Sequence, residues 1–204
     1  MLRKIAVIFI IGLMLPITTG SAIAAGTDDA RQFVDNVGKR VLDIINGGGG
    51  KDQKQAQLRQ MFSDNVDMEW MGKFVSGQGW RQATGDQRNR YMQAYKQYLL
   101  ARYTTNFADY TGSKYTITDV KDEGEGEFTV NMQIKTPGQQ QQNTLAGYRV
   151  HSENGQFKII DIIIEGVSLI TTQRSDFSSV LQQKGMDGLI SAIEAKATAE
   201  KSGK

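Results

Sequence analysis

Asp161 is the side chain in this sequence that is best placed for acid or base chemistry. It interrupts the run IIDIII at residues 159–164, in which every other side chain is apolar and β-branched. A carboxyl group in such a strand is expected to be buried, where it acts as a general acid or base or, more commonly, as a structural group. A structural carboxylate would be held by a Tyr, an Arg or backbone donors, and Arg174 is a candidate partner by sequence proximity.

The other reactive side chains do not form a recognisable catalytic set. The single histidine, His151, lies among charged neighbours near a predicted hairpin end, which favours a surface position. Ser168 lies in EGVSL rather than in a G-x-S-x-G turn, and no histidine follows it. The chain has no cysteine and no carboxylate cluster with metal-ligand spacing, and the glycines at residues 47–50 are not followed by Lys-Ser or Lys-Thr. The sequence therefore predicts no catalytic residue, metal or cofactor, and it favours binding over catalysis.

The N-terminus has the pattern of a secretory signal peptide. Arg3 and Lys4 precede an apolar stretch at residues 5–15, Pro16 interrupts it, and AIAA follows at residues 22–25. The apolar stretch is shorter than the roughly 20 residues that a membrane span requires. We therefore expect residues 1–24 to be removed as a signal peptide on export.

The charge balance and length limit the function of the mature chain. Without the leader, 22 basic side chains face 22 acidic ones. With neither an excess of positive charge nor a Lys/Arg run, the sequence predicts no nucleic-acid binding and no polybasic membrane recruitment. About 180 residues suit one core. We expect a single domain at residues 25–195, a polar C-terminal tail at residues 196–204, and a monomer.

The periodicity of apolar residues predicts helices, then a sheet, then helices. Helical spacing is found at residues 28–46, 51–62, 68–75 and 84–110. Thr84 and Gln87 have the spacing of a capping box. Period-two alternation predicts four antiparallel strands at residues 115–120, 128–134, 145–150 and 157–164. Helical spacing then resumes and pauses at Gly185. The expected fold class is α+β, with a curved antiparallel four-stranded sheet packed against several helices.

Two further patterns bear on the interior of the domain. Asn154-Gly155 is a strong hairpin signal, and a two-residue turn there places Val150 opposite Ile159 and Tyr148 opposite Asp161. One strand face would then carry Tyr148, Val150, Phe157, Ile159 and Ile163, with Asp161 as its polar exception. Tyrosines form a stripe along the helix at residues 84–110, which either faces the core or lines a ligand cavity; they are Tyr91, Tyr95, Tyr98, Tyr103 and Tyr110.

Several motifs in this order resemble the MlaC family of periplasmic phospholipid-binding proteins, also described as toluene-tolerance auxiliary proteins. They are WMGKFV at residues 70–75, Trp80-Arg81, Gln87-Arg88, Tyr98-Leu99, EGVSLI at residues 165–170, QRSDF at residues 173–177, and Gly185 with Leu189-Ile190. The resemblance implies an NTF2-like fold with an apolar cavity for acyl chains. It also implies a periplasmic shuttle between an outer-membrane lipoprotein–porin complex and an inner-membrane ABC transporter with an MCE-domain subunit, which maintains outer-membrane lipid asymmetry.

On this resemblance, phospholipid is the cargo and no cofactor is expected. The apolar residues expected to line the cavity are Val37, Val41, Ile45, Trp70, Met71, Phe74, Val75, Tyr95, Tyr98, Leu99, Tyr103, Met132, Val150, Ile159, Ile163 and Leu169. The candidate polar or head-group contacts are Lys73, Arg81, Asp161 and Arg174. Three alternatives stay open: a hopanoid carrier of a related branch, an NTF2-like enzyme that uses Asp161 and a Tyr on an apolar substrate, and an adaptor for protein segments.

Overall fold

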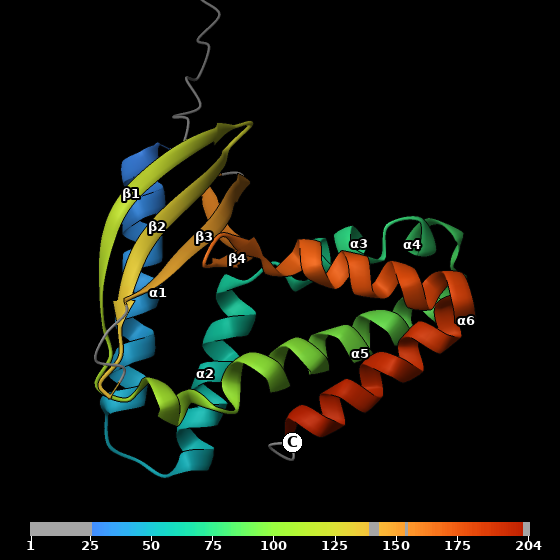
Figure 1. The fold of residues 1–204 in the computed structure, drawn as a ribbon, viewed down its shortest axis with the longest axis horizontal. Coiled ribbons are helices and arrows are strands. Elements are labelled where there is room, and N and C mark those ends of the chain that lie inside the picture. Colours follow the sequence, from blue (N-terminus) through green and yellow to red (C-terminus); the bar gives the residue numbers. More distant parts are fainter. Residues whose placement is uncertain (1–25, 139–142, 154, 202–204) are drawn as a thin grey trace, which may run out of the picture.

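The computed structural model describes residues 26–138, 143–153 and 155–201, so the expected signal peptide lies outside the described residues. A curved antiparallel sheet stands beside a layer of helices, and α1 (Thr27–Asn46) lies along the sheet (Figure 1). Tyr115 on the first strand donates a 2.9 Å hydrogen bond to the carbonyl oxygen of Asp35 and packs against Gly38. These contacts attach α1 to the edge of the sheet.

The sheet has five strands in sequence order, one more than the four expected. They are β1 (Lys114–Gly124), β2 (Glu127–Lys135), β3 (Thr144–Glu153), β4 (Gln156–Ile164) and β5 (Val167–Ser168). The additional strand exists because Glu165 and Gly166 both have positive φ, at 49° and 79°, which turns the chain back in two residues. The Glu165 carboxylate accepts a 2.7 Å hydrogen bond from the backbone N–H of Leu145 on β3, which holds this turn against the sheet.

The register of β3 and β4 was predicted correctly at one end and wrongly at the other. Val150 lies opposite Ile159 as expected, but a bulge then shifts the pairing by one residue. Asp161 consequently lies opposite Arg149, and Tyr148 lies opposite Ile162. The predicted Tyr148–Asp161 pair is therefore wrong, and Asp161 shares its face with Arg149 rather than with Tyr148.

The helices agree closely with the sequence pattern, with small differences at their ends. They are α1, α2 (Lys51–Asn65), α3 (Met68–Ser76), α4 (Gln78–Gln82), α5 (Gly85–Thr104) and α6 (Leu169–Lys201), with a 3-10 turn at Phe107–Tyr110. The capping box at Thr84 is present, since its hydroxyl accepts from the N–H of Gln87 and the Gln87 amide oxygen accepts from the N–H of Thr84. The helix expected to reach residue 110 ends at Thr104, and α4 was not predicted.

Gly185 divides α6 into two arms that fold back on each other (Figure 1). Its φ of 65° and ψ of −169° are conformations that only glycine adopts readily. The second arm continues to Lys201, Ala197 within it is buried, and Glu200 pairs with Arg102 of α5 at 2.9 Å. The fold-back thus places both arms of α6 against α5.

Candidate functional site

One continuous cluster of apolar side chains, termed here the main apolar cluster, joins α1, the sheet, α3, α5 and both arms of α6. Ala30 and Val34 represent α1 in it, and Val130 represents the sheet. Twelve of the expected cavity residues belong to it or pack against it: Val37, Trp70, Met71, Phe74, Val75, Tyr95, Tyr98, Leu99, Tyr103, Met132, Val150 and Ile159. The interior of the domain is therefore apolar across the junction between sheet and helices.

The other four expected cavity residues lie elsewhere. Val41 and Ile45 belong to a small separate cluster with Leu58 and Phe107. Ile163 lies on the opposite sheet face, where its Cβ approaches Gly147, because the bulge in β4 turns Ile162 and Ile164 toward the main apolar cluster instead. The predicted face of Ile163 is therefore wrong. Leu169, at the start of α6, is half-buried and outside both clusters of the described residues.

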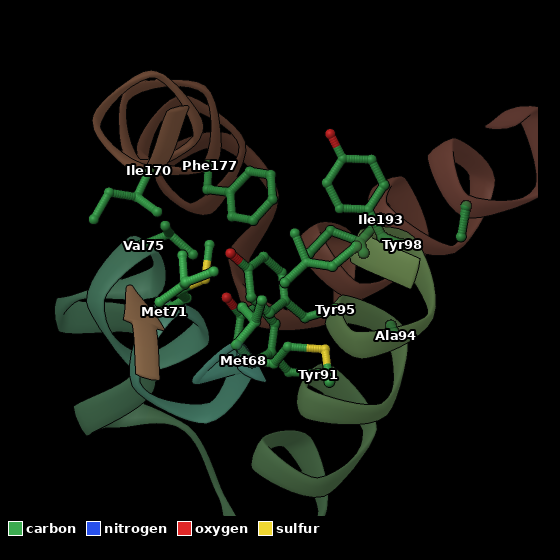
Figure 2. Close-up of a cluster of buried hydrophobic side chains, with 14 of the residues drawn as sticks. Met68, Met71, Val75, Tyr91, Ala94, Tyr95, Tyr98, Ile170, Phe177 and Ile193 are labelled. Carbon is green, nitrogen blue, oxygen red and sulfur yellow. The ribbon is translucent and has the colours of Figure 1, made fainter. Parts of the chain in front are cut away.

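Tyrosine hydroxyls tie α5 to its neighbours inside the main apolar cluster (Figure 2). Tyr91 donates to the carbonyl oxygen of Gly72 on α3 at 2.8 Å, and Tyr95 donates to Oε1 of Gln173 on α6 at 2.8 Å. The two rings stack with centroids 5.8 Å apart. Burial raises the pKa of both phenols, so they remain neutral donors. These bonds satisfy polar atoms that burial would otherwise leave without partners.

The close approach of α3 and α5 depends on Gly72. A Cβ at that position would lie 3.0 Å from Cε of Met92 and 3.0 Å from Cδ1 of Tyr95. Gly72 is buried and faces Met92 and Tyr95 of α5. The motif WMGKFV therefore contains the residue that lets these two helices pack closely.

Gln173 is a buried residue that sequence reasoning missed. Its side chain is 8% exposed and accepts the Tyr95 hydroxyl bond. A signal was available, because Ile170, Gln173 and Phe177 recur at three and four residue steps on the buried face of α6. A polar residue on an apolar helical face predicts a buried hydrogen-bond partner.

Asp161 is buried, with 1% of its surface exposed, and is bound by the start of α6. Its Oδ2 accepts a 2.6 Å hydrogen bond from the Ser168 hydroxyl, and its Oδ1 accepts a 3.1 Å bond from the backbone N–H of Ile170. Ser168 also accepts from the N–H of Thr171, so it caps the start of α6. The expected pairing of Asp161 with Arg174 is wrong, because Arg174 donates to the carbonyl oxygen of Phe74 at 3.0 Å.

The three candidate head-group cations are exposed and lie on α3, α4 and α6, whereas Asp161 is buried in β4. Lys73 pairs with Glu69 at 2.7 Å, and its Nζ lies 5.7 Å from the ring centroid of Trp80. Arg81 is exposed, and Arg174 places its guanidinium 4.8 Å from the ring centroid of Phe74. The three cations are therefore exposed, whereas twelve of the predicted cavity residues belong to or pack against the main apolar cluster.

His151 is not the surface residue that the sequence favoured. Its side chain is 18% exposed, its Nε2 lies 3.2 Å from Oδ2 of Asp67, and its ring lies 6.3 Å from that of Trp70. Oδ1 of Asp67 accepts from the N–H of Trp70 and caps α3. His151 therefore supports the start of α3. Within the described residues, no group of three or more His, Asp or Glu side chains could hold a metal ion.

The fold and this interior can be compared with known proteins. Residues 35–195 match the family described as MlaC protein. The chain belongs to the MlaC family. It is 22% identical over 139 residues to the intermembrane phospholipid transport system binding protein MlaC of Haemophilus influenzae. That alignment covers 65% of this chain and 63% of the relative.

A solved structure has the same fold. The phospholipid-binding protein from Ralstonia solanacearum, determined in complex with a phospholipid, superposes with a TM-score of 0.74 at 20% identity. The superposition covers 84% of this chain and 98% of that protein. The α+β architecture of this MlaC family member, a sheet packed against helices, is therefore confirmed. In the part of the chain that the structure describes, no helix is both long and apolar enough to cross a membrane.

Proposed function

We propose that this MlaC family member is a periplasmic phospholipid carrier that shuttles lipid between an outer-membrane lipoprotein–porin complex and an inner-membrane ABC transporter with an MCE-domain subunit. The observation that carries the proposal is the main apolar cluster, which extends from Ala30 of α1 through the sheet to Ala197 of α6. The family match and the phospholipid in the Ralstonia solanacearum protein support it. Transport of this kind would serve outer-membrane lipid asymmetry.

The physics of lipid transfer requires such a carrier. Each buried methylene contributes about 0.8 kcal/mol, so two acyl chains of roughly fifteen methylenes would cost on the order of 20 kcal/mol to expose to water. Free lipid therefore does not diffuse between membranes at a useful rate. A protein interior of apolar side chains removes most of that cost.

The proposed acyl-chain site lies between the sheet and the helical layer. Met132 on β2 and Tyr103 on α5 belong to or pack against the main apolar cluster from these two sides, and Val37 reaches it from α1. Methionines such as Met71 and Met132 adapt to chains of different length because their thioethers are flexible. The head group would remain in solvent at the opening of this acyl-chain site. One site could then bind lipids with different head groups and release them.

The carrier is proposed to act without chemical conversion of its cargo. The enzyme alternative requires Asp161 and a Tyr to face a substrate, but both oxygens of Asp161 are bound by Ser168 and Ile170. Tyr95 in turn is bound to Gln173. These groups hold structural elements together, so we assign them a structural role.

Native mass spectrometry with lipid extraction tests the proposal. The full chain would be expressed with its own leader and purified from the periplasm without detergent. We expect a mass increment of one two-chain phospholipid. A hopanoid mass would instead support the related branch, and an unliganded mass that resists loading from vesicles would contradict the carrier function and favour an adaptor for protein segments.

A further inference from the structure

Three arginines and a lysine on α3, α4, α5 and α6 are connected through contacts with Trp80, Phe74 and the backbone of Arg81, and this group is termed here the basic strip. Its members are Lys73, Arg81, Arg88 and Arg174. Two of the guanidinium groups are held in place by backbone carbonyls. Arg174 binds the carbonyl of Phe74 on α3, and Arg88 donates from Nε to Trp80 at 2.9 Å and from Nη2 to Arg81 at 3.0 Å.

Aromatic rings also hold the charged groups of the basic strip in position. The guanidinium of Arg174 lies over the ring of Phe74. The guanidinium of Arg88, at 5.4 Å from the ring centroid, and the ammonium of Lys73 both lie over Trp80. These contacts restrict the guanidinium groups of Arg88 and Arg174, whose remaining N–H donors can bind a ligand. The basic strip is therefore preorganised, which reduces the entropy lost when a partner binds.

Within the described residues, one of the four cations of the basic strip has an acidic partner, because Lys73 pairs with Glu69 at 2.7 Å. Among the described residues, Arg81, Arg88 and Arg174 have no carboxylate oxygen within the 4.0 Å of a salt bridge. By contrast, Arg90 and Arg102 on the neighbouring α5 pair with Asp187 and Glu200, both at 2.9 Å. Because the mature chain has equal numbers of acidic and basic side chains, this local excess of positive charge is a specific feature of one face.

We propose that the basic strip docks an acidic protein surface on the inner-membrane transporter with its MCE-domain subunit. This inference rests on the proposed carrier function. Fixed guanidinium forks match carboxylates in bidentate geometry. A membrane surface fits less well, because binding at the bilayer interface needs exposed apolar anchors. The large apolar residues that are exposed in the described chain are Tyr110, Leu145 and Val167, which lie outside the basic strip.

Lipid transfer with a charge-reversed variant tests the proposal. Arg81→Glu is the best change, because in the described contacts Arg81 uses only its backbone carbonyl, so the fold keeps its bonds. Arg40→Glu, at an exposed position on α1, is the matched control. Protein loaded with a fluorescent phospholipid would be mixed with vesicles of phosphatidylcholine and phosphatidylglycerol, either plain or carrying the inner-membrane transporter with its MCE-domain subunit.

We expect Arg81→Glu to slow transfer to the transporter vesicles about tenfold at low salt, with a smaller effect at high salt, because charge reversal at an interface lowers the association rate. Transfer to plain vesicles, lipid retention and the thermal midpoint should match those of Arg40→Glu. Equal slowing with plain vesicles would assign the strip to a membrane surface, and loss of bound lipid would assign it to the head group. Either result, or no slowing at all, overturns the proposal.

A second measurement separates this inference from the carrier function itself. Surface plasmon resonance of the unliganded protein against the isolated periplasmic part of the transporter does not depend on bound lipid. Weaker binding by Arg81→Glu than by Arg40→Glu supports the strip even if no lipid is carried. Equal binding by both variants refutes it even if the protein carries lipid.

Discussion

Replacement of Asp161 by alanine should destabilise the protein strongly. The substitution removes the acceptor of two hydrogen bonds, from the Ser168 hydroxyl and from the N–H of Ile170, at a site that is 1% exposed. A hydrogen bond to a charged group contributes about 1.5–3 kcal/mol, and a negative charge at a helix N-terminus adds about 0.3–1 kcal/mol. Because the Ser168 hydroxyl can turn to other acceptors, we expect a net loss of about 3 kcal/mol.

Asp161→Asn separates the charge from the hydrogen bonds. Its amide oxygen can accept from Ile170, and its amide nitrogen can donate to Ser168, so this variant should lose only about 1 kcal/mol. The assay is urea denaturation followed by tryptophan fluorescence on lipid-free protein, because bound ligand would add its own stabilisation. Asp119→Ala, at an exposed position on β1, controls for loss of an aspartate.

The reasoning is refuted if Asp161→Ala unfolds within about 0.5 kcal/mol of the wild type, which is the range of neutral surface changes. It is also refuted if Asp161→Asn is as unstable as Asp161→Ala. In addition, Asp161→Asn should retain its lipid. Conversion of the bound lipid by the wild type that is lost in a stable Asp161→Asn variant would instead support the enzyme alternative.

Three further predictions follow from other elements. Tyr95→Phe leaves the amide oxygen of Gln173 without its buried donor and should cost about 1–2 kcal/mol in urea denaturation. Gly185→Ala should cost about 1–3 kcal/mol from backbone strain alone, because no atom lies within 4 Å of the added Cβ. The control is Gly48→Ala, which has equal space around the added Cβ but no positive φ and should be neutral in the same assay. Burial raises the pKa of Tyr95 above its unfolded value of about 10, so the folded state keeps a proton that the unfolded state loses. The free energy of unfolding should therefore fall as pH rises above about 10. The fall should be smaller in Tyr95→Phe when denaturation midpoints are measured against pH.

Sequence reasoning located most of the secondary structure because local signals determine it. The capping box at Thr84 and the hairpin pair Val150–Ile159 both formed as expected. It failed in the second half of β4, where apolar residues on both faces of the strand remove the alternation that would reveal a bulge. The bulge reversed the face of Ile163 and placed Asp161 opposite Arg149. No local pattern encodes such a shift.

The candidate site was harder to predict because it depends on contacts between distant segments. Val41 and Ile45 continue the apolar face of α1, and nothing in their spacing shows that they pack on Leu58 and Phe107 rather than on the main apolar cluster. The basic strip is similarly hidden from sequence reasoning, since Arg174 lies 100 residues after Phe74, whose carbonyl oxygen it binds. Burial and pairing across such distances follow from the tertiary fold.

The main apolar cluster also has a consequence for how the chain acquires its structure. Ala30 near one end of the sequence and Ile193 near the other belong to the same buried group, and the second arm of α6 contributes Leu189 and Ile190. Contacts between such distant segments form late and slow the folding reaction. A nascent chain that lacks its last residues cannot close this core. Completion of the main apolar cluster therefore requires the second arm of α6, which comes late in the sequence.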